Sequence, residues 1–238
     1  MRKLSLLVPL LLWAGASASA QSAFKGFYVA AGVGMDTFLP TADNVTLKVK
    51  NGPFAGTYPQ TTTYPRALDF TGVISVGSLS AITNKFLLGI GVEYEPIAAG
   101  TDSVKSVGSK GVATYSTYRQ KSHYNVFLSP AYALREDKLV YGKIGYSNST
   151  SEVDFDGAES PEHFAEGIIL GAGYRQIVSG GLFLFGEANY FHYLPTDYTV
   201  TTLTKDGVLY NSDSRVTSKG FSTLVGVGYT LPRSLTRK

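Results

Sequence analysis

Cysteine is absent from this sequence of 238 residues, and charged residues make up only 16% of it. Without cysteine the chain forms no disulfide framework and carries no lipidated cysteine, so burial and backbone hydrogen bonding must hold the fold together. Neither sign of charge dominates, with 21 Lys and Arg against 18 Asp and Glu. This balance argues against a nucleic-acid-binding protein and against a polybasic protein of the membrane surface.

Long apolar runs are also missing beyond the first twenty residues, and those residues have the features of a cleavable signal peptide. Arg2 and Lys3 precede an apolar run from Leu4 to Ala14, and the segment ends on small side chains at Ala18-Ser19-Ala20. The run is shorter than the roughly 20 apolar residues that a membrane-spanning helix needs. We therefore expect residues 1–20 to be removed on export from a bacterial cytoplasm, which leaves a mature chain that begins at Gln21.

Eight segments of the remaining sequence carry apolar side chains at every second position. In the clearest segment, from Phe86 to Glu95, large apolar residues alternate with Leu, Gly and Glu. Because successive side chains of a strand point to opposite faces of its sheet, this period of two predicts β-strands with one apolar face. The other seven segments span approximately 27–35, 68–76, 124–132, 140–146, 168–174, 182–190 and 221–231.

The connections between these segments alternate between short and long. Three are short, around Ser80–Asn84, Arg135–Asp137 and Ser179–Gly181. Four run approximately over 39–67, 96–117, 148–163 and 194–216 and are rich in Thr, Ser, Asp, Lys, Gly and Tyr. Short turns at one rim and long polar loops at the other are typical of outer-membrane barrels, whose short turns lie in the periplasm. The sequence therefore predicts an all-β fold: an eight-stranded antiparallel up-and-down transmembrane β-barrel over residues 21–231, with short periplasmic turns, four long extracellular loops and a short basic periplasmic tail at 232–238.

One hairpin allows the register of its two strands to be predicted. Val178 and Leu182 both belong to apolar faces, and they flank the three residues Ser179-Gly180-Gly181. Directly opposed residues of a hairpin share a face of the sheet, so we expect Val178 to lie opposite Leu182. A three-residue turn needs a glycine in the left-handed region, which this sequence supplies.

Alternation alone does not say whether the apolar face meets lipid or lines a sheltered pocket, as in a soluble lipocalin-like barrel. The opposite face decides between them, because a face in water should be dense in charged side chains. Around 168–174 and 221–231 it carries mainly glycine and other small residues, which suit the cramped interior of an eight-stranded barrel. We therefore expect the apolar face to point outward into lipid, with an aromatic girdle at the bilayer interfaces formed by Phe27, Tyr94, Tyr124, Tyr146, Tyr190 and Phe221.

A sparse set of side chains on the inward face predicts a polar network in the lumen: Glu93, His123, Asn125, Lys143, Arg175 and Glu187. Buried charges must be paired or wetted. The hairpin register places Arg175 and Glu187 as diagonal neighbours, within reach of each other's long side chains. We hypothesise that these two residues form an ion pair that fills and closes the lumen, in preference to a gate or an ion path.

Residues with the chemistry of a catalytic or metal site are scattered along the sequence. His123 is on the inward face and has no identified catalytic partner, His192 is on the lipid-facing side, and His163 lies at the edge of a loop. The stretch Asp154-Phe155-Asp156-Gly157 lacks the further ligands and the closing Glu of a calcium loop. We therefore expect a protein that is not an enzyme, with no catalytic residues, no cofactor and no metal ion.

Six stretches of the strand segments carry a resemblance to a known family: Gly26–Gly34, Leu128–Leu134, Leu139–Tyr146, Gly171–Arg175, Gly186–Tyr190 and Leu224–Tyr229. They resemble the OmpA-like and opacity-type eight-stranded outer-membrane barrels. The motifs of that family specify architecture rather than activity. The resemblance implies insertion by the outer-membrane assembly machinery, contact with outer-membrane lipids including lipopolysaccharide, and in many relatives adhesion or immune exposure through the loops. One difference is that Leu231 occupies the place of the usual terminal aromatic residue, and Pro232–Lys238 follows it.

From the sequence we expect a monomeric protein of the bacterial cell surface, either an adhesin or antigen or a structural barrel of the envelope, that acts through its extracellular loops. Host or surface ligands of those loops are the expected partners, and nucleic acid is not. A small porin-like channel for ions or small solutes is the first alternative. A lipid-modifying barrel enzyme is the second, although the sequence shows no catalytic trio for it.

Overall fold

The computed structural model describes residues 23–53, 55–60, 65–96, 99–102, 104–107, 113–155, 158–159, 162–203 and 209–231. The expected signal peptide and the basic tail lie outside the described residues. Within these ranges, no helix is long and apolar enough to cross a membrane. The regular structure of the described chain consists of antiparallel β-strands.

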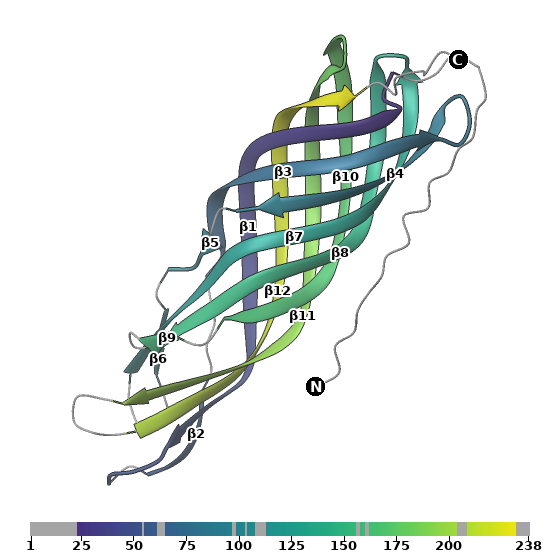
Figure 1. Cartoon of the computed structure of the whole chain (residues 1–238). Helices are drawn as coiled ribbons and strands as arrows, with labels where there is room; N and C mark the ends of the chain where they lie inside the picture. The colour runs from purple at the N-terminus through teal and green to yellow at the C-terminus, as the bar shows by residue number, and fades with distance from the viewer. Residues whose placement is uncertain are drawn as a thin grey trace.

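Eight long strands form the wall of a barrel (Figure 1). They are β1 (Gly26–Val49), β3 (Ala67–Ala81), β4 (Phe86–Glu95), β7 (Ala113–Arg135), β8 (Lys138–Phe155), β10 (His163–Ser179), β11 (Leu182–Leu203) and β12 (Leu209–Leu231). Around the wall they follow the order β1-β12-β11-β10-β8-β7-β4-β3, and β3 pairs with β1 to close the ring. Four short strands pair with the ends of β1, β7 and β8: β2 (Gly56–Gln60), β5 (Ala99–Gly100), β6 (Val104–Val107) and β9 (Ala158–Glu159).

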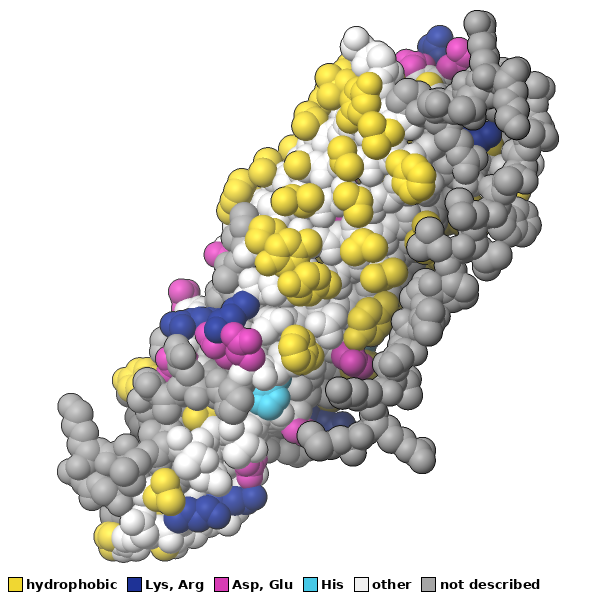
Figure 2. Space-filling model, in the orientation of Figure 1, with side chains coloured by type: hydrophobic (Ala, Val, Ile, Leu, Met, Phe, Trp, Pro, Cys, Tyr) yellow, Lys and Arg dark blue, Asp and Glu magenta, His cyan; other side chains and the backbone are white. Residues whose placement is uncertain are grey.

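The eight predicted strands and their faces are confirmed. β4 has the predicted bounds, and exposed and buried side chains alternate along its whole length. Phe86 is 55% exposed, for example, whereas Leu87 is 3% exposed. The large apolar side chains of the predicted apolar faces form an apolar band on the outer surface (Figure 2). The inward positions hold glycine and polar residues together with buried aromatic and aliphatic side chains. This arrangement is that of a barrel whose outside is solvated by lipid.

A collar of polar residues marks the end of the apolar band that lies away from the short turns. On each of five neighbouring strands, a polar outward residue directly follows the apolar band. Two pairs of these residues are directly opposed, His192 with Lys219 and Asn148 with Glu166. We call the part of the barrel beyond them the extracellular extension, and charged side chains are frequent there (Figure 2). The collar consists of Ser122 (β7), Asn148 (β8), Glu166 (β10), His192 (β11) and Lys219 (β12).

The structure corrects the predicted boundaries of the extracellular loops, because much of each predicted loop is strand. β1 continues to Val49, β8 to Phe155 and β11 to Leu203, while β7 begins at Ala113 and β12 at Leu209. Beyond the collar most outward residues are polar, with exceptions such as Phe164 and Leu194, so apolar side chains no longer recur at every second position. The Thr, Tyr and Val residues of these segments still favour strands, and the backbone pairing of the barrel continues through them.

The hairpin between β10 and β11 corrects the predicted turn and confirms the register. Ser179 pairs with Leu182, and the register shifts by one residue just before this pair. Val178 therefore forms a bulge and does not lie opposite Leu182, so the prediction of a three-residue turn is wrong. The turn is Gly180-Gly181, and Gly180 has a φ of 55°, which glycine adopts without steric cost. On the far side of the bulge the predicted register holds.

Candidate functional site

The lumen of the barrel is filled in three layers. A cluster of buried apolar side chains lies nearest the short turns, an aromatic cluster lies nearest the extension, and charged side chains lie between them. The periplasmic cluster consists of Phe24, Tyr28, Ala30, Leu79, Leu87, Ala131, Ala133, Leu139, Tyr141 and Phe183. The aromatic cluster consists of Phe38, Ala67, Tyr118, Ala165, Ile169, Phe191, Tyr193, Tyr198 and Val216.

Lys143 on β8 is the centre of the charged layer. Its Nζ donates to Glu93 Oε1 at 2.7 Å and to Glu187 Oε1 at 2.5 Å. Glu187 also accepts hydrogen bonds from Tyr141 Oη at 2.7 Å and from the Asn189 amide at 2.8 Å. All of these side chains are buried. Since buried charges are tolerated only when they are paired and hydrogen-bonded, this network is what allows two carboxylates to lie inside the wall.

The hypothesis of an ion pair between Arg175 and Glu187 is wrong. Arg175 lies instead within the periplasmic cluster, where the centre of its guanidinium is 4.1 Å from the ring centroid of Tyr28 and 4.6 Å from that of Tyr141. The register is as predicted, with Arg175 opposite Phe185, but the side chain packs on aromatic faces in a cation–π arrangement. Glu187 takes Lys143 as its cation in place of Arg175.

A glycine explains how Tyr141 on β8 reaches Glu187 on β11 across the intervening strand β10. Gly173 on β10 lies opposite Tyr141 of β8 and opposite Glu187 of β11. A Cβ at this glycine would overlap the ring of Tyr141. Because there is none, Tyr141 lies over β10 and its hydroxyl bonds to Glu187. Strand parity predicted that Lys143 and Glu187 face inward, but the contact between Tyr141 and Glu187 on alternate strands depends on this space.

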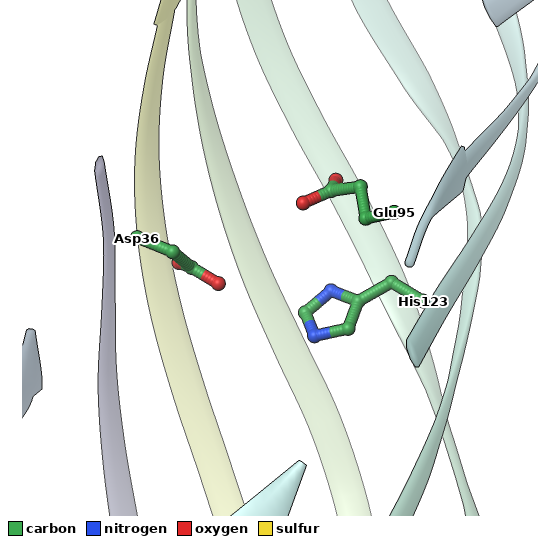
Figure 3. A group of neighbouring side chains, drawn as sticks. All are labelled: Asp36, Glu95 and His123. Carbon is green, nitrogen blue, oxygen red and sulfur yellow. The ribbon is translucent and has the colours of Figure 1, made fainter. Parts of the chain in front are cut away.

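A second polar group lies between the charged layer and the aromatic cluster. Asp36 on β1, Glu95 on β4 and His123 on β7 each contribute one oxygen or nitrogen atom of the kind that binds metals, and these atoms lie within 4.8 Å of one another. The three side chains are buried and point toward one another (Figure 3). Glu95 and His123 are directly opposed in the pairing of β4 with β7, whereas Asp36 approaches from β1, on the far side of β3. We call this group the lumen triad.

The two carboxylates of the lumen triad differ in their hydrogen bonding. Thr71 Oγ1 donates to Glu95 Oε2 at 3.1 Å, and the Asn125 amide donates to Glu95 Oε1 at 3.4 Å. Oδ1 of Asp36, by contrast, is buried and has no hydrogen-bond partner among the described residues. One carboxylate is therefore held in place by donors, and the other points an unsatisfied oxygen into the lumen.

The imidazole of His123 is held by the aromatic cluster. Its Nδ1 lies 3.3 Å from Tyr193 Oη, and that hydroxyl lies 2.9 Å from Ser147 Oγ. The ring also packs edge-to-face against Phe191, with 5.6 Å between ring centroids. These contacts fix the plane of the imidazole, so the arrangement of two carboxylates and one oriented imidazole is suited to binding a proton or a cation.

The structure divides the predicted lumen network between three places. Glu93, Lys143, Glu187 and Asn125 lie in the charged layer, His123 is in the lumen triad, and Arg175 is in the periplasmic cluster. Sequence reasoning missed Asp36 and Glu95 as site residues. Glu95 is the last inward residue of the predicted strand 86–95, and Asp36 directly follows the outward Met35 that ends the predicted strand 27–35. Strand parity was therefore the available signal, but it does not show which inward residues of distant strands meet.

The six residues of the predicted aromatic girdle all lie on the outer surface. Phe27 stands near the short turns, and the other five stand on the side of the apolar band nearest the collar. Their placement in the two interfaces of a bilayer remains a prediction. They are Phe27, Tyr94, Tyr124, Tyr146, Tyr190 and Phe221, and between 37% and 60% of each is exposed.

Solved structures of outer-membrane proteins resemble this barrel. OprG from Pseudomonas aeruginosa superposes with a TM-score of 0.59 and 13% sequence identity, covering 89% of this chain and 98% of that chain. The protease OmpT from Escherichia coli has a TM-score of 0.49 and 9% identity, covering 87% and 97%. Neisserial surface protein A has a TM-score of 0.40 and 16% identity, covering 87% and 98%. At such identities the likeness to OprG shows the fold alone.

The family comparison is more direct. No curated protein matches the chain, but the family described as the outer membrane protein beta-barrel domain matches residues 6–211. That range covers most of the sequence and includes the strands that form the lumen triad and the charged layer. The closed ring of eight strands, the outward apolar band and this match agree, and the chain belongs to the outer membrane protein beta-barrel domain family.

Proposed function

We propose that this outer-membrane barrel is a surface recognition protein, of the adhesin or antigen type, that acts through its extracellular extension while its lumen stays closed. The observation that carries the proposal is the filling of the lumen on both sides of the charged layer. If nothing passes through the lumen, the function must depend on the surface of the barrel, and binding residues are most often carried by exposed loops such as those of the extracellular extension.

The aromatic cluster closes the lumen toward the extension. Phe38 stacks on Tyr118 with 5.7 Å between ring centroids, and Phe191 stacks on Tyr193 with 6.3 Å between centroids. Each of these four rings is at most 2% exposed. A solute could pass only if packed aromatic rings moved aside, and at the next layer it would have to disrupt the ion pairs of Lys143. Both steps oppose free passage.

The extension is an ordered platform held by polar contacts. Lys121 Nζ on β7 lies 2.8 Å from Glu152 Oε2 on β8 and 2.8 Å from Glu162 Oε1. The hydrogen bond that Lys121 donates to Glu152 is the largest of the causes that raise the pKa of Lys121 above its ordinary value. Surface charges of this kind contribute little energy each, but several together restrain the strands that present the loops.

A closed lumen should show in permeability measurements. Liposomes that contain the folded protein should swell in isotonic sugar at the rate of protein-free liposomes, because the aromatic cluster leaves no wide polar path. A porin of known conductance reconstituted in the same lipid is the positive control. Swelling near that of the porin would contradict the proposal and favour the channel alternative.

Recognition through the extension should be lost when the extension is shortened. In one variant, residues 200–212 are replaced by Asn-Gly, which joins Thr199 directly to Asp213 through a two-residue hairpin turn. Cells of a non-adherent Escherichia coli strain that display the full chain should adhere to an epithelial cell monolayer, and cells that display the shortened chain should not. The shortened barrel should still migrate as a folded species on an unheated denaturing gel. Equal adherence of the two, or none by the full chain, would contradict the proposal.

Lys48 and Asp213 connect three strands of the extension. Lys48 Nζ on β1 donates to Asp213 Oδ2 on β12 at 2.6 Å, and Thr199 Oγ1 on β11 donates to Asp213 Oδ1 at 2.9 Å. The hydrogen bond from Lys48 is the main cause that lowers the pKa of Asp213 below its ordinary value. A carboxyl with a lowered folded-state pKa stabilises the fold above its unfolded pKa of about 3.9, and this contribution disappears as the pH falls through the folded-state pKa.

The extension should therefore loosen in acid. We expect amide hydrogen exchange over residues 209–216, corrected for its intrinsic pH dependence, to speed up below about pH 4. The effect should be small, about 0.2–1 kcal/mol, because the pair is partly exposed. Asp213→Asn should remove most of the pH step, and Asp197→Asn, at a carboxylate 3.8 Å from Arg215, serves as the control. An unchanged pH step in Asp213→Asn would show that another group is responsible.

A further inference from the structure

We propose that the lumen triad, Asp36, Glu95 and His123, binds one divalent transition-metal ion such as Zn²⁺ inside the barrel. The site would connect β1, β4 and β7 on the extension side of the charged layer. It is independent of the surface recognition proposed above, since none of the three side chains lies on the outer surface.

The donor atoms of the three residues lie close enough together to bind a single ion. One atom from each of the three residues lies within 4.8 Å of the other two. Two ligands on an ion at about 2.0–2.2 Å are about 3–4 Å apart, so small side-chain rotations bring all three into contact with one ion. Three protein ligands leave a further coordination position for water or another small ligand.

The buried carboxylates of Asp36 and Glu95 lack a basic side chain to pair with in the described part of the chain. In the neighbouring layer, Lys143 compensates Glu93 and Glu187. In the described part of the chain, neither Asp36 nor Glu95 has a Lys or Arg within ion-pair distance. Burial of carboxylates without a counter-charge is costly, and a divalent cation would supply the charge that the protein lacks.

One carboxylate oxygen of Asp36 is buried and makes no hydrogen bond within the described chain. The residue is 4% exposed, its Oδ1 has no hydrogen-bond partner among the described residues, and its carboxylate faces the imidazole of His123 (Figure 3). A buried polar atom without a partner requires an explanation, such as an ion that is bound there. The missing partner of this oxygen is an observation separate from the distances between the three groups, and it also indicates a cation site at the lumen triad.

The surrounding residues match the outer shell of a metal site. A metal-binding histidine commonly donates its other ring N–H to a neighbouring acceptor, which fixes its tautomer. If His123 Nδ1–H donates to Tyr193 Oη, and Tyr193 in turn donates to Ser147 Oγ, then Nε2 carries the lone pair that binds the metal. Thr71 and Asn125 similarly orient Glu95 through donated hydrogen bonds.

The ligand chemistry selects the class of ion. Calcium and magnesium prefer sites made of oxygen, whereas an imidazole together with carboxylates suits zinc and neighbouring first-row metals. Beside the triad, the buried hydroxyls of Ser147, Ser149 and Ser151 follow one another on the inward face of β8. Ser149 is directly opposite His123.

The test is metal binding by the barrel folded from the chain Gln21–Lys238 in detergent, after treatment with a chelator and removal of that chelator. With ZnCl₂ as the probe, metal analysis after gel filtration should find one Zn²⁺ per chain. Asp36→Asn and His123→Gln should each weaken binding at least tenfold, and His192→Gln, which removes a histidine of the collar, should leave it unchanged. Added ZnCl₂ should raise the unfolding temperature of the wild-type barrel and not that of Asp36→Asn.

A separate variant covers the case in which a triad substitution prevents folding. Tyr193→Phe keeps the packed ring and removes the acceptor of the His123 N–H, so it should weaken zinc binding by about 10-fold to 100-fold. The proposal would be overturned if the wild type bound zinc no more tightly than folded Asp36→Asn or Tyr193→Phe. In that case protons would neutralise the carboxylates of the triad. Binding of CaCl₂ or MgCl₂ as tight as that of ZnCl₂ would overturn the assignment to a transition metal.

Discussion

Lys143→Met is expected to destabilise the folded barrel by about 3–5 kcal/mol, because it leaves Glu93 and Glu187 buried without their shared cation. The expected result is a large fall in the urea concentration at which the detergent-folded protein loses its compact form on an unheated gel. Methionine keeps most of the volume of the lysine stem, so the loss reports charge more than packing.

Two further variants identify the cause of that loss. The triple substitution Glu93→Gln, Lys143→Met, Glu187→Gln removes all three charges and should recover much of the stability, since replacing a whole buried ion network is far less costly than breaking it. Lys50→Met makes the same change at an exposed lysine and should have little effect. If the Lys143→Met barrel were as stable as the Lys50→Met barrel, Lys143 would not stabilise the fold by pairing with Glu93 and Glu187.

Gly226→Val is expected to prevent closure of the barrel. Gly226 on β12 lies opposite Gly32 on β1 and opposite Phe185 on β11. A Cβ at this position would overlap the backbone carbonyl of Ala31, and it would lie 2.5 Å from the ring of Phe185. Overpacking usually costs about 1–3 kcal/mol, and the cost should be larger here because the obstacle is the backbone of the strand that closes the ring.

The matched control is the same substitution on the neighbouring strand. Gly186 on β11 is opposite Val225, and a Cβ there would meet nothing within 4 Å. Gly186→Val should fold as well as the wild type or better, because a β-branched residue favours a strand and adds apolar surface to the outer band. A folded Gly226→Val with wild-type heat stability would show that the β1–β12 seam is looser than the structure indicates.

The transmembrane part of the fold could be predicted from the sequence because it is governed by one simple rule. In β4, apolar and small or polar side chains alternate from Phe86 to Glu95, and each falls on the expected face. The register of β10 and β11 also followed from parity, although the bulge at Val178 did not. A bulge adds one unpaired residue to a strand, and no particular residue type marks it in the sequence. The prediction therefore counted Ser179 as part of a three-residue turn.

The extension and the polar interior were less predictable. Beyond the collar, β11 still buries Tyr198 and Val200 on its inward face, but its register shifts between Tyr193 and Thr196. The apolar alternation is interrupted there, so the sequence did not show that Thr199 and Asp213 lie in paired strands. Inside the lumen, side chains from strands far apart in the sequence meet across the barrel. The partners of Glu187 and Asp36 therefore depend on which strands face each other and on which glycines leave space, and neither appears in local sequence.

The apolar band of the barrel is expected to contact lipid acyl chains, and tryptophan fluorescence tests this contact most directly. Trp13 is the single tryptophan of the sequence and falls in the expected signal peptide, so the chain from Gln21 allows one tryptophan to be introduced at a time. Ile144→Trp places it in the middle of the band on β8, where the native side chain is 55% exposed, and Thr201→Trp places it on the exposed surface of the extension. In vesicles of phosphatidylcholine brominated near the middle of its acyl chains, fluorescence of Ile144→Trp should be strongly quenched and that of Thr201→Trp should not. Equal fluorescence of Ile144→Trp in brominated and ordinary vesicles, with the protein folded in both, would contradict the account.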